Sequence, residues 1–276
     1  MDLGHYAQSC ANAYRDIGEI NGWRKGRNSS RGYDALTVPS GAWDDRPHER
    51  YLLVVHGHLS SAAAHLAACG HSFAAGNFGP VVTLARAAFV ESSKAAWLLE
   101  DGVMWTHRAA RAHVELLGNL EMQVRRLPKR LDNGYPNFVR KQWQVNRKQL
   151  RDEVIVDLFG KRGLSREGDD LALVGEELLT ASQLEEQFTA LIGVDALSGA
   201  YVVAPDLLVD PTASISVELE TLLGVDTALS ARSVAIAIDA WLAGLGAWVH
   251  YNAWGTGRVD ELKDELSNLA GVVPDN

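Results

Sequence analysis

The stretch that decides the fold is PVVTLARAAFVESSKAAWLLEDGVMWTHRAARAHVELLGNLEMQVRRL, residues 80–127. Apolar and small residues recur in it every three or four positions on both sides of a break at Asp101–Gly102, and this is the period of an amphipathic α-helix. The sequence therefore predicts two long helices, at about 80–100 and 103–127, which form a central antiparallel hairpin. We expect an all-α protein, a helical bundle built around this hairpin.

The same period predicts further helices on both sides of the hairpin. We expect them at about 3–20, 45–69, 137–159, 170–191, 214–223, 230–254 and 259–269. The polar stretch 21–41 is expected to be a surface loop, and Gly70 is expected to follow the end of its helix. Alternation of period two is scarce, and residues 201–203 are the only fragment that looks like a strand.

Three parts of the chain differ in composition. Residues 1–45 are expected to form an N-terminal helix and a loop, and residues 46–166 a helical core that ends in a basic helix. Residues 167–276 form an acidic helical half that is expected to pack on the core in one compact unit.

The bulk composition is that of a globular protein, with 47% hydrophobic and 22% charged residues in 276. The two cysteines, Cys10 and Cys69, offer no disulfide framework. No basic segment followed by an apolar run resembles a secretory signal. The longest apolar run, Val234–Val249, falls short of the ~20 residues that a membrane span needs. We therefore expect a cytoplasmic protein with no membrane partner.

Charge is distributed unevenly around a net value of −9. Between Arg125 and Arg166 there are twelve Lys/Arg against four Asp/Glu, whereas Glu167–Ala231 contains thirteen acids and no Lys or Arg. Such blocks attract each other within a subunit or across a dimer, or the basic block binds phosphate backbones. We expect a homodimer, and RNA is a candidate partner. The candidate nucleic-acid-binding residues are Arg125, Arg126, Lys129, Arg130, Arg140, Lys141, Arg147 and Lys148.

Glu91 and His113 are the strongly polar residues on the apolar faces of the two central helices. They lie about ten and eleven residues from the break, so an antiparallel pair would bring them to the same height. A carboxylate that faces an imidazole in a partly dry seam raises the pKa of the histidine and suits general acid–base chemistry. A buried polar pair that only fixes the register of the helices has the same geometry, and both interpretations stay open.

The run LARAAFVESSKAAWLLEDGVMWTHRAARAHVELL, residues 84–117, resembles the helical core of HEPN-type proteins, a bacterial class of all-α bundles. The resemblance covers about residues 50–160. Many HEPN members are metal-independent ribonucleases that dimerise to bring two Arg-x4–6-His motifs together. The resemblance implies that Arg108 would steady a phosphate, that His113 would act on the 2′-hydroxyl or the leaving oxygen, and that the setting is stress or phage defence.

Two other classes of function remain open. One is a non-catalytic helical module for protein–protein interaction, and the other is a small-molecule or metal enzyme with a Glu/His site in the bundle. His65 and Cys69 have the i, i+4 spacing of a metal-binding pair but no acidic partner on their helix, so neither a metal nor a cofactor is expected. A His113 that reaches solvent beside basic side chains would favour RNA cleavage, whereas a buried His113 would favour the interaction module.

Overall fold

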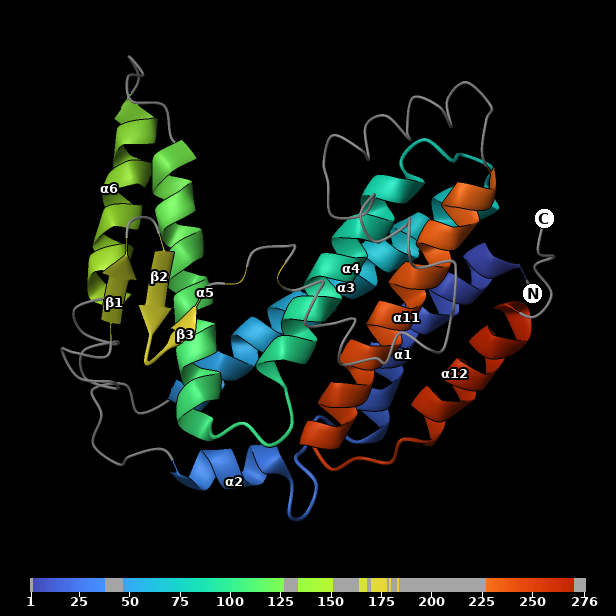
Figure 1. The fold of residues 1–276 in the computed structure, drawn as a ribbon, viewed down its shortest axis with the longest axis horizontal. Helices are drawn as coiled ribbons and strands as arrows, with labels where there is room; N and C mark the ends of the chain where they lie inside the picture. The colour runs from blue at the N-terminus through green and yellow to red at the C-terminus, as the bar shows by residue number, and fades with distance from the viewer. Residues whose placement is uncertain are drawn as a thin grey trace. The chain divides into compact units, whose positions relative to one another are not determined.

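The computed structural model describes residues 2–37, 47–126, 134–150, 164–167, 170–177, 179, 183 and 227–270. Its helices are α1 (Leu3–Ile20), α2 (Ser30–Thr37), α3 (Pro47–Ala74), α4 (Val81–Leu98), α5 (Trp105–Arg126), α6 (Gly134–Gln149), α11 (Thr227–Tyr251) and α12 (Gly257–Ala270). Its strands are β1 (Leu164–Glu167), β2 (Asp170–Leu173) and β3 (Glu176–Glu177) (Figure 1). The predicted all-α bundle is confirmed, with one small sheet added to it within the described residues.

Two compact units divide the chain. Unit 1 comprises Met1–Tyr33, His56–Asp101 and Thr180–Asn276, and unit 2 comprises Asp34–Val55 and Gly102–Leu179. Each unit therefore contains segments that are far apart in sequence. The bounds of the two units differ from those of the three parts that were distinguished by composition.

The centre of unit 1 is α11, which packs most extensively on α4 and also contacts α1 and α12 (Figure 1). The backbones of α11 and α4 come close because Gly244 has no side chain: a Cβ there would lie 3.1 Å from the carbonyl oxygen of Ser92. Trp241 of α11 is fully buried and donates its indole N–H to the carbonyl of Cys10 on α1 at 2.8 Å. The apolar run 234–249 is thus the core of unit 1.

In the part of the chain that the structure describes, two helices are long and apolar enough to cross a membrane by length and composition alone, His48–Ala74 in α3 and Ser230–Tyr251 in α11. The apolar run within α11 falls short of this length by itself, but flanking residues extend the helix to 25 residues. Most of the apolar window of α11, 67%, is buried inside the protein, against 39% of the window in α3. A mostly buried core helix of a globular protein can have the same length and apolar composition as α11.

The expected end of the helix 45–69 before Gly70 is wrong, because α3 continues to Ala74. Gly70 lies where α3 meets α1. A Cβ on Gly70 would lie 2.5 Å from the carbonyl oxygen of Gly4, and a Cβ on Gly4 would lie 2.6 Å from that of Gly70. The glycine is therefore a contact point between two helices and does not end its own.

The expected loop 21–41 is also partly wrong, because it contains α2. Ser29 precedes this helix, and its hydroxyl accepts a hydrogen bond from the backbone N–H of Gly32 at 3.0 Å. A serine at this position satisfies one of the free N–H groups of the first turn, which is a strong signal for a helix start. The glycine content of the segment obscured this signal.

In unit 2, α5 contacts α6 as well as β2 and β3. The expected helix 170–191 is wrong at its start, because Asp170–Leu173 is strand β2, paired antiparallel with β1 and β3. Val174 and Gly175 form the two-residue turn between β2 and β3, with φ values of 55° and 82°. Two successive positive φ angles reverse the chain into a hairpin, and a helix cannot continue through them.

The break between the two central helices is confirmed, since Gly102 has a φ of 75° between the ends of α4 and α5. The helices themselves belong to different units, so their pairing as a hairpin stays a prediction. The expected helix 214–223 and the strand-like fragment 201–203 lie outside the described residues.

Candidate functional site

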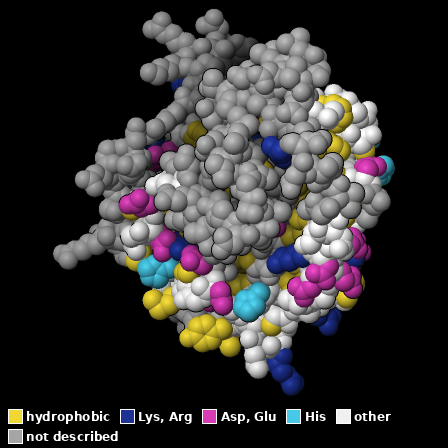
Figure 2. All heavy atoms as spheres, turned by 45° about the vertical axis from the view of Figure 1, so that its right-hand side comes forward, with side chains coloured by type: hydrophobic (Ala, Val, Ile, Leu, Met, Phe, Trp, Pro, Cys, Tyr) yellow, Lys and Arg dark blue, Asp and Glu magenta, His cyan; other side chains and the backbone are white. Residues whose placement is uncertain are grey.

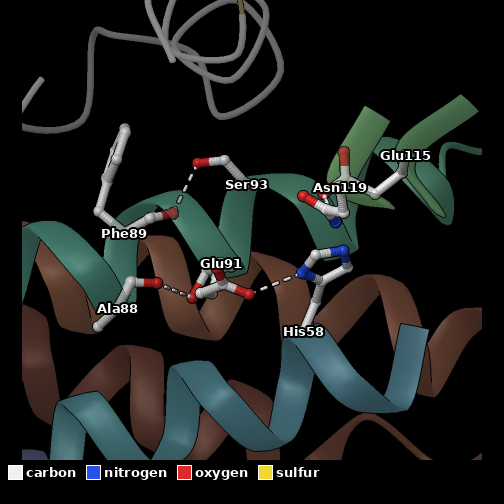
Figure 3. Close-up of polar contacts among 8 residues, drawn as sticks. His58, Ala88, Phe89, Glu91, Ser93, Glu115 and Asn119 are labelled. Carbon is white, nitrogen blue, oxygen red and sulfur yellow. Dashed lines mark hydrogen bonds and ion pairs between the residues drawn. The ribbon is translucent and has the colours of Figure 1, made fainter. Parts of the chain in front are cut away.

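Glu91 lies on α4 and pairs with His58 of α3. The Nδ1 atom of His58 is 2.6 Å from the carboxylate of Glu91, and the two side chains are 10% and 26% exposed (Figure 3). The partner expected from the sequence was His113, which lies in the other unit. The structure therefore gives Glu91 a histidine partner other than the expected one, and its pairing with His113 stays a prediction.

Burial alone would raise the pKa of Glu91, but the hydrogen bond to His58 and the electrostatic interaction with it act in the opposite direction. Lys94 and His65 add smaller effects of the same sign, and the net result is a pKa below the ordinary value of 4.5. The carboxylate is therefore ionised near pH 7. A fixed carboxylate that binds an imidazole can orient that imidazole as a general base, or the pair can hold α3 against α4. The same hydrogen-bonded pair would serve either role.

Arg108 lies on α5 and is almost completely buried, with 4% of its surface exposed. Its Nη1 atom donates to Asp34 at 2.9 Å, and the side chain of Asp34 is 2% exposed. A buried arginine needs such a partner, because an uncompensated charge in the interior is costly. Within the described structure, Arg108 thus joins α5 to α2.

His113 is fully buried on α5. Its Nδ1 atom lies 2.6 Å from the carbonyl oxygen of Ala109, one turn earlier in the same helix. A carbonyl oxygen only accepts hydrogen bonds, so Nδ1 carries a proton and donates it. The buried position of His113 favours the non-catalytic interaction module over RNA cleavage, and a role of His113 in catalysis stays a prediction.

Glu176 on β3 was not among the residues predicted from the sequence, although it links the sheet to α5. Its carboxylate lies 2.9 Å from Nδ1 of His107 and 2.8 Å from Nε of Arg111. Glu176 belongs to the acidic block and Arg111 precedes the basic block. Glu176 of the acidic block thus forms an ion pair with Arg111, which lies outside the basic block. Counting the charges in the two blocks did not predict this contact.

The basic residues predicted to bind nucleic acid divide into three groups. Arg140, Lys141, Arg147 and Lys148 lie on α6, Arg125 and Arg126 end α5, and Lys129 and Arg130 lie outside the described residues. Helix α6 contains these four cations and no acidic residue. Lys141 and Lys148 are exposed, whereas Arg140 and Arg147 are half-buried.

The exposed face of α6 also carries apolar side chains. Phe138 is 66% exposed and Val145 is 51% exposed. At 100° per residue, Phe138, Lys141, Val145 and Lys148 fall within an arc of about 80° on the helix. We call these four residues the outer face of α6. The opposite side carries Trp143, half-buried, and Leu150, buried, as expected for the side that packs inward.

Other surfaces and clusters of the described residues are less distinctive. On the face that Figure 2 shows, acidic, basic and apolar side chains are interspersed.

No group of three or more His, Cys, Asp or Glu side chains in the described part of the chain is placed to hold a metal ion. His65 and Cys69 share α3, where Cys69 is buried and donates to the carbonyl of Val81 at 3.5 Å.

No protein-family model, no curated protein and no solved structure matches this chain.

Proposed function

We propose that unit 2 binds RNA through the outer face of α6. The observation that supports this proposal is the composition of that face: two exposed lysines and an exposed phenylalanine lie on one side of a helix that has no acid. Lysines neutralise backbone phosphates, and an aromatic ring stacks on bases, so together they suit single-stranded nucleic acid.

The positions of the motif residues argue against cleavage through Arg108 and His113. Arg108 forms an ion pair with Asp34 at 2.9 Å and His113 is fully buried, so both side chains are part of the interior of unit 2. A general acid–base group has to come within hydrogen-bond reach of the proton that it transfers. The proposed activity is therefore recognition of RNA by a HEPN-like helical protein.

The homodimer, the cytoplasmic location and the role in stress or phage defence belong to the same proposal. Their support is the resemblance of residues 84–117 to HEPN-type helices and the separation of charge into a basic and an acidic block. Charge blocks of opposite sign attract each other across an interface when they do not meet within one subunit.

Fluorescence anisotropy with a short labelled single-stranded RNA tests the binding surface. The double variant Lys141→Gln/Lys148→Gln should bind the RNA roughly tenfold more weakly, a decrease of about 1.4 kcal/mol in binding free energy. The slope of log affinity against log salt should become shallower by about 0.7 for each phosphate that the variant no longer neutralises. Phe138→Ala should also weaken binding, by about 1–3 kcal/mol for a stacked base, with an unchanged salt slope.

The matched control is Lys25→Gln/Lys263→Gln, which removes two exposed lysines of unit 1 and changes the net charge equally. This control should bind RNA as the wild type does. Equally weakened binding in both double variants would mean that only the total charge matters, and wild-type protein that binds no RNA at ~50 mM salt would end the proposal.

A further inference from the structure

Unit 1 contains a cavity of about 600 Å³ beside the N-terminal helix. Its walls include Tyr14 and Arg15 of α1, Trp23 in the following turn, Arg31 of α2, and His56 and Ser60 of α3. Pockets for small molecules commonly have volumes of about 300–1,000 Å³ and combine aromatic walls with a few polar groups. The RNA-binding proposal does not use any of these residues.

Among the described residues, the lining is rich in hydrogen-bond donors and cations and contains no carboxylate. Arg31 is half-buried, and none of the described Asp or Glu side chains forms an ion pair with it. Its Nη1 atom donates to the side chain of Asn252 at 2.9 Å and to the carbonyl of Trp23 at 3.3 Å, and its guanidinium lies 5.9 Å from the ring centre of Trp248. A guanidinium has five N–H donors, so this arrangement leaves donors for an anion. The second arginine, Arg15, lies 3.8 Å from Asp16 and 3.9 Å from Glu19 on the surface, and both are long contacts for an ion pair.

Tyr14 and His56 form a neutral polar wall. The Tyr14 hydroxyl and Nδ1 of His56 are hydrogen-bonded to each other. Burial raises the pKa of Tyr14 to about 12, and burial together with the charge of Arg31 lowers the pKa of His56. Near pH 7 the phenol is protonated and the imidazole is uncharged, so neither group cancels the positive charge of Arg31.

Trp23 forms an aromatic wall in a strained conformation. Its φ is 57°, which is uncommon for a bulky residue, and the residue is 38% exposed. The ring packs directly on Gly18, where a Cβ would lie 2.2 Å from it. Its centroid is 5.3 Å from that of Tyr14 and 5.8 Å from that of His56. Strained residues persist where surrounding contacts enforce them, often at ligand sites.

We infer that this cavity binds a small organic anion that carries a planar ring and one phosphate or carboxylate group. Arg31, with Arg15 at the rim, holds the anionic group. Trp23 stacks against the ring, and Ser60 and Tyr14 offer hydroxyl groups for its polar atoms. The ring and the charge are both required, because the aromatic wall and the arginine supply separate contributions to binding.

Isothermal titration calorimetry with four probes tests the ligand class. Adenosine 5′-monophosphate carries a ring and a phosphate, indole-3-acetate carries a ring and a carboxylate, adenosine lacks the charge, and inorganic phosphate lacks the ring. At least one of the two ring anions should bind, and adenosine and phosphate should each bind at least roughly tenfold more weakly. Which of the two ring anions binds more tightly distinguishes phosphate from carboxylate as the anionic group.

A matched pair of variants on α3 tests the place of binding. Ala63 lines the cavity, whereas Ala64 is exposed and points about 100° away. Ala63→Glu places a negative charge in the cavity and should weaken binding of the ring anion roughly tenfold or more. Ala64→Glu has the same charge and should bind it as the wild type does, and so should the Lys141→Gln/Lys148→Gln variant of unit 2. The melting temperatures of both alanine variants should stay close to that of the wild type, because neither site is buried.

Three results would overturn the inference. The first is that neither ring anion binds the folded wild-type protein. The second is that adenosine binds as tightly as its monophosphate, which would remove the requirement for charge. The third is that Ala63→Glu and Ala64→Glu bind equally well, which would place the ligand elsewhere.

Discussion

At the scale of single residues, the charged side chains of the interior find partners that are distant in sequence. Arg108 meets Asp34, which is 74 positions away, and Arg111 meets Glu176, which is 65 positions away. Periodicity showed that Glu91 lies at the edge of an apolar face, but periodicity reports direction around one helix and carries no information on the neighbouring helix. For this reason the sequence could indicate which face of a helix a charged residue occupies, but not which residue of another helix pairs with it.

The Glu91–His58 pair should make the stability of unit 1 depend on pH. The pKa of Glu91 is lower in the folded protein than its ordinary value of 4.5, so the unfolded state binds more protons in this range. The contribution of Glu91 is therefore complete above about pH 5 and disappears as the pH falls through its folded pKa. Urea unfolding at a series of pH values measures this decrease, and Glu91→Gln should reduce the slope below about pH 5. An unchanged slope in Glu91→Gln would show that other carboxylates determine the acid sensitivity.

At the scale of elements, glycines decided whether a helix was predicted correctly. The bounds of α1 could be predicted because Asp2 caps it and its apolar positions repeat regularly, and both signals are local. The end of α3 was predicted too early because Gly70 looks like the end of a helix, whereas its role is to let α1 come close. The sheet was missed because its strands are only two to four residues long and too short to show a period.

Two glycines of α3 should respond oppositely to alanine. Gly70→Ala places a methyl group 2.5 Å from the carbonyl oxygen of Gly4, and this backbone atom cannot move without moving α1. We expect a decrease of about 1–3 kcal/mol in the free energy of unfolding. Among the described residues, no atom lies within 4 Å of the corresponding position on Gly57, so Gly57→Ala should gain about 0.5–1 kcal/mol from the lower backbone entropy of the unfolded chain. Chemical denaturation of the two variants measures both, and equal effects would contradict the close approach of α1 and α3.

At the scale of the whole molecule, the separation of charge into a basic and an acidic block leads to a prediction about the oligomeric state. The proposed homodimer would have twice the chain mass of 30.0 kDa. If opposite charge blocks hold it together, raising the salt to ~1 M should shift the mass measured by light scattering towards that of one chain, because the Debye length falls to about 3 Å. A mass of one chain at low salt would exclude the dimer, and a dimer that persists at high salt would show that apolar contacts hold it.

The hydrogen bond from Trp241 to Cys10 has a consequence for how the protein is made. It joins residues that are 231 positions apart, so α1 leaves the ribosome long before α11 exists. At about 5–20 residues per second, the delay is on the order of ten to fifty seconds. During this time Tyr6 and Cys10, which are fully buried in the finished protein, have no α11 to pack against. Translation of α11 therefore limits when unit 1 can close, and until then the apolar face of α1 lacks the helix that covers it in the folded protein.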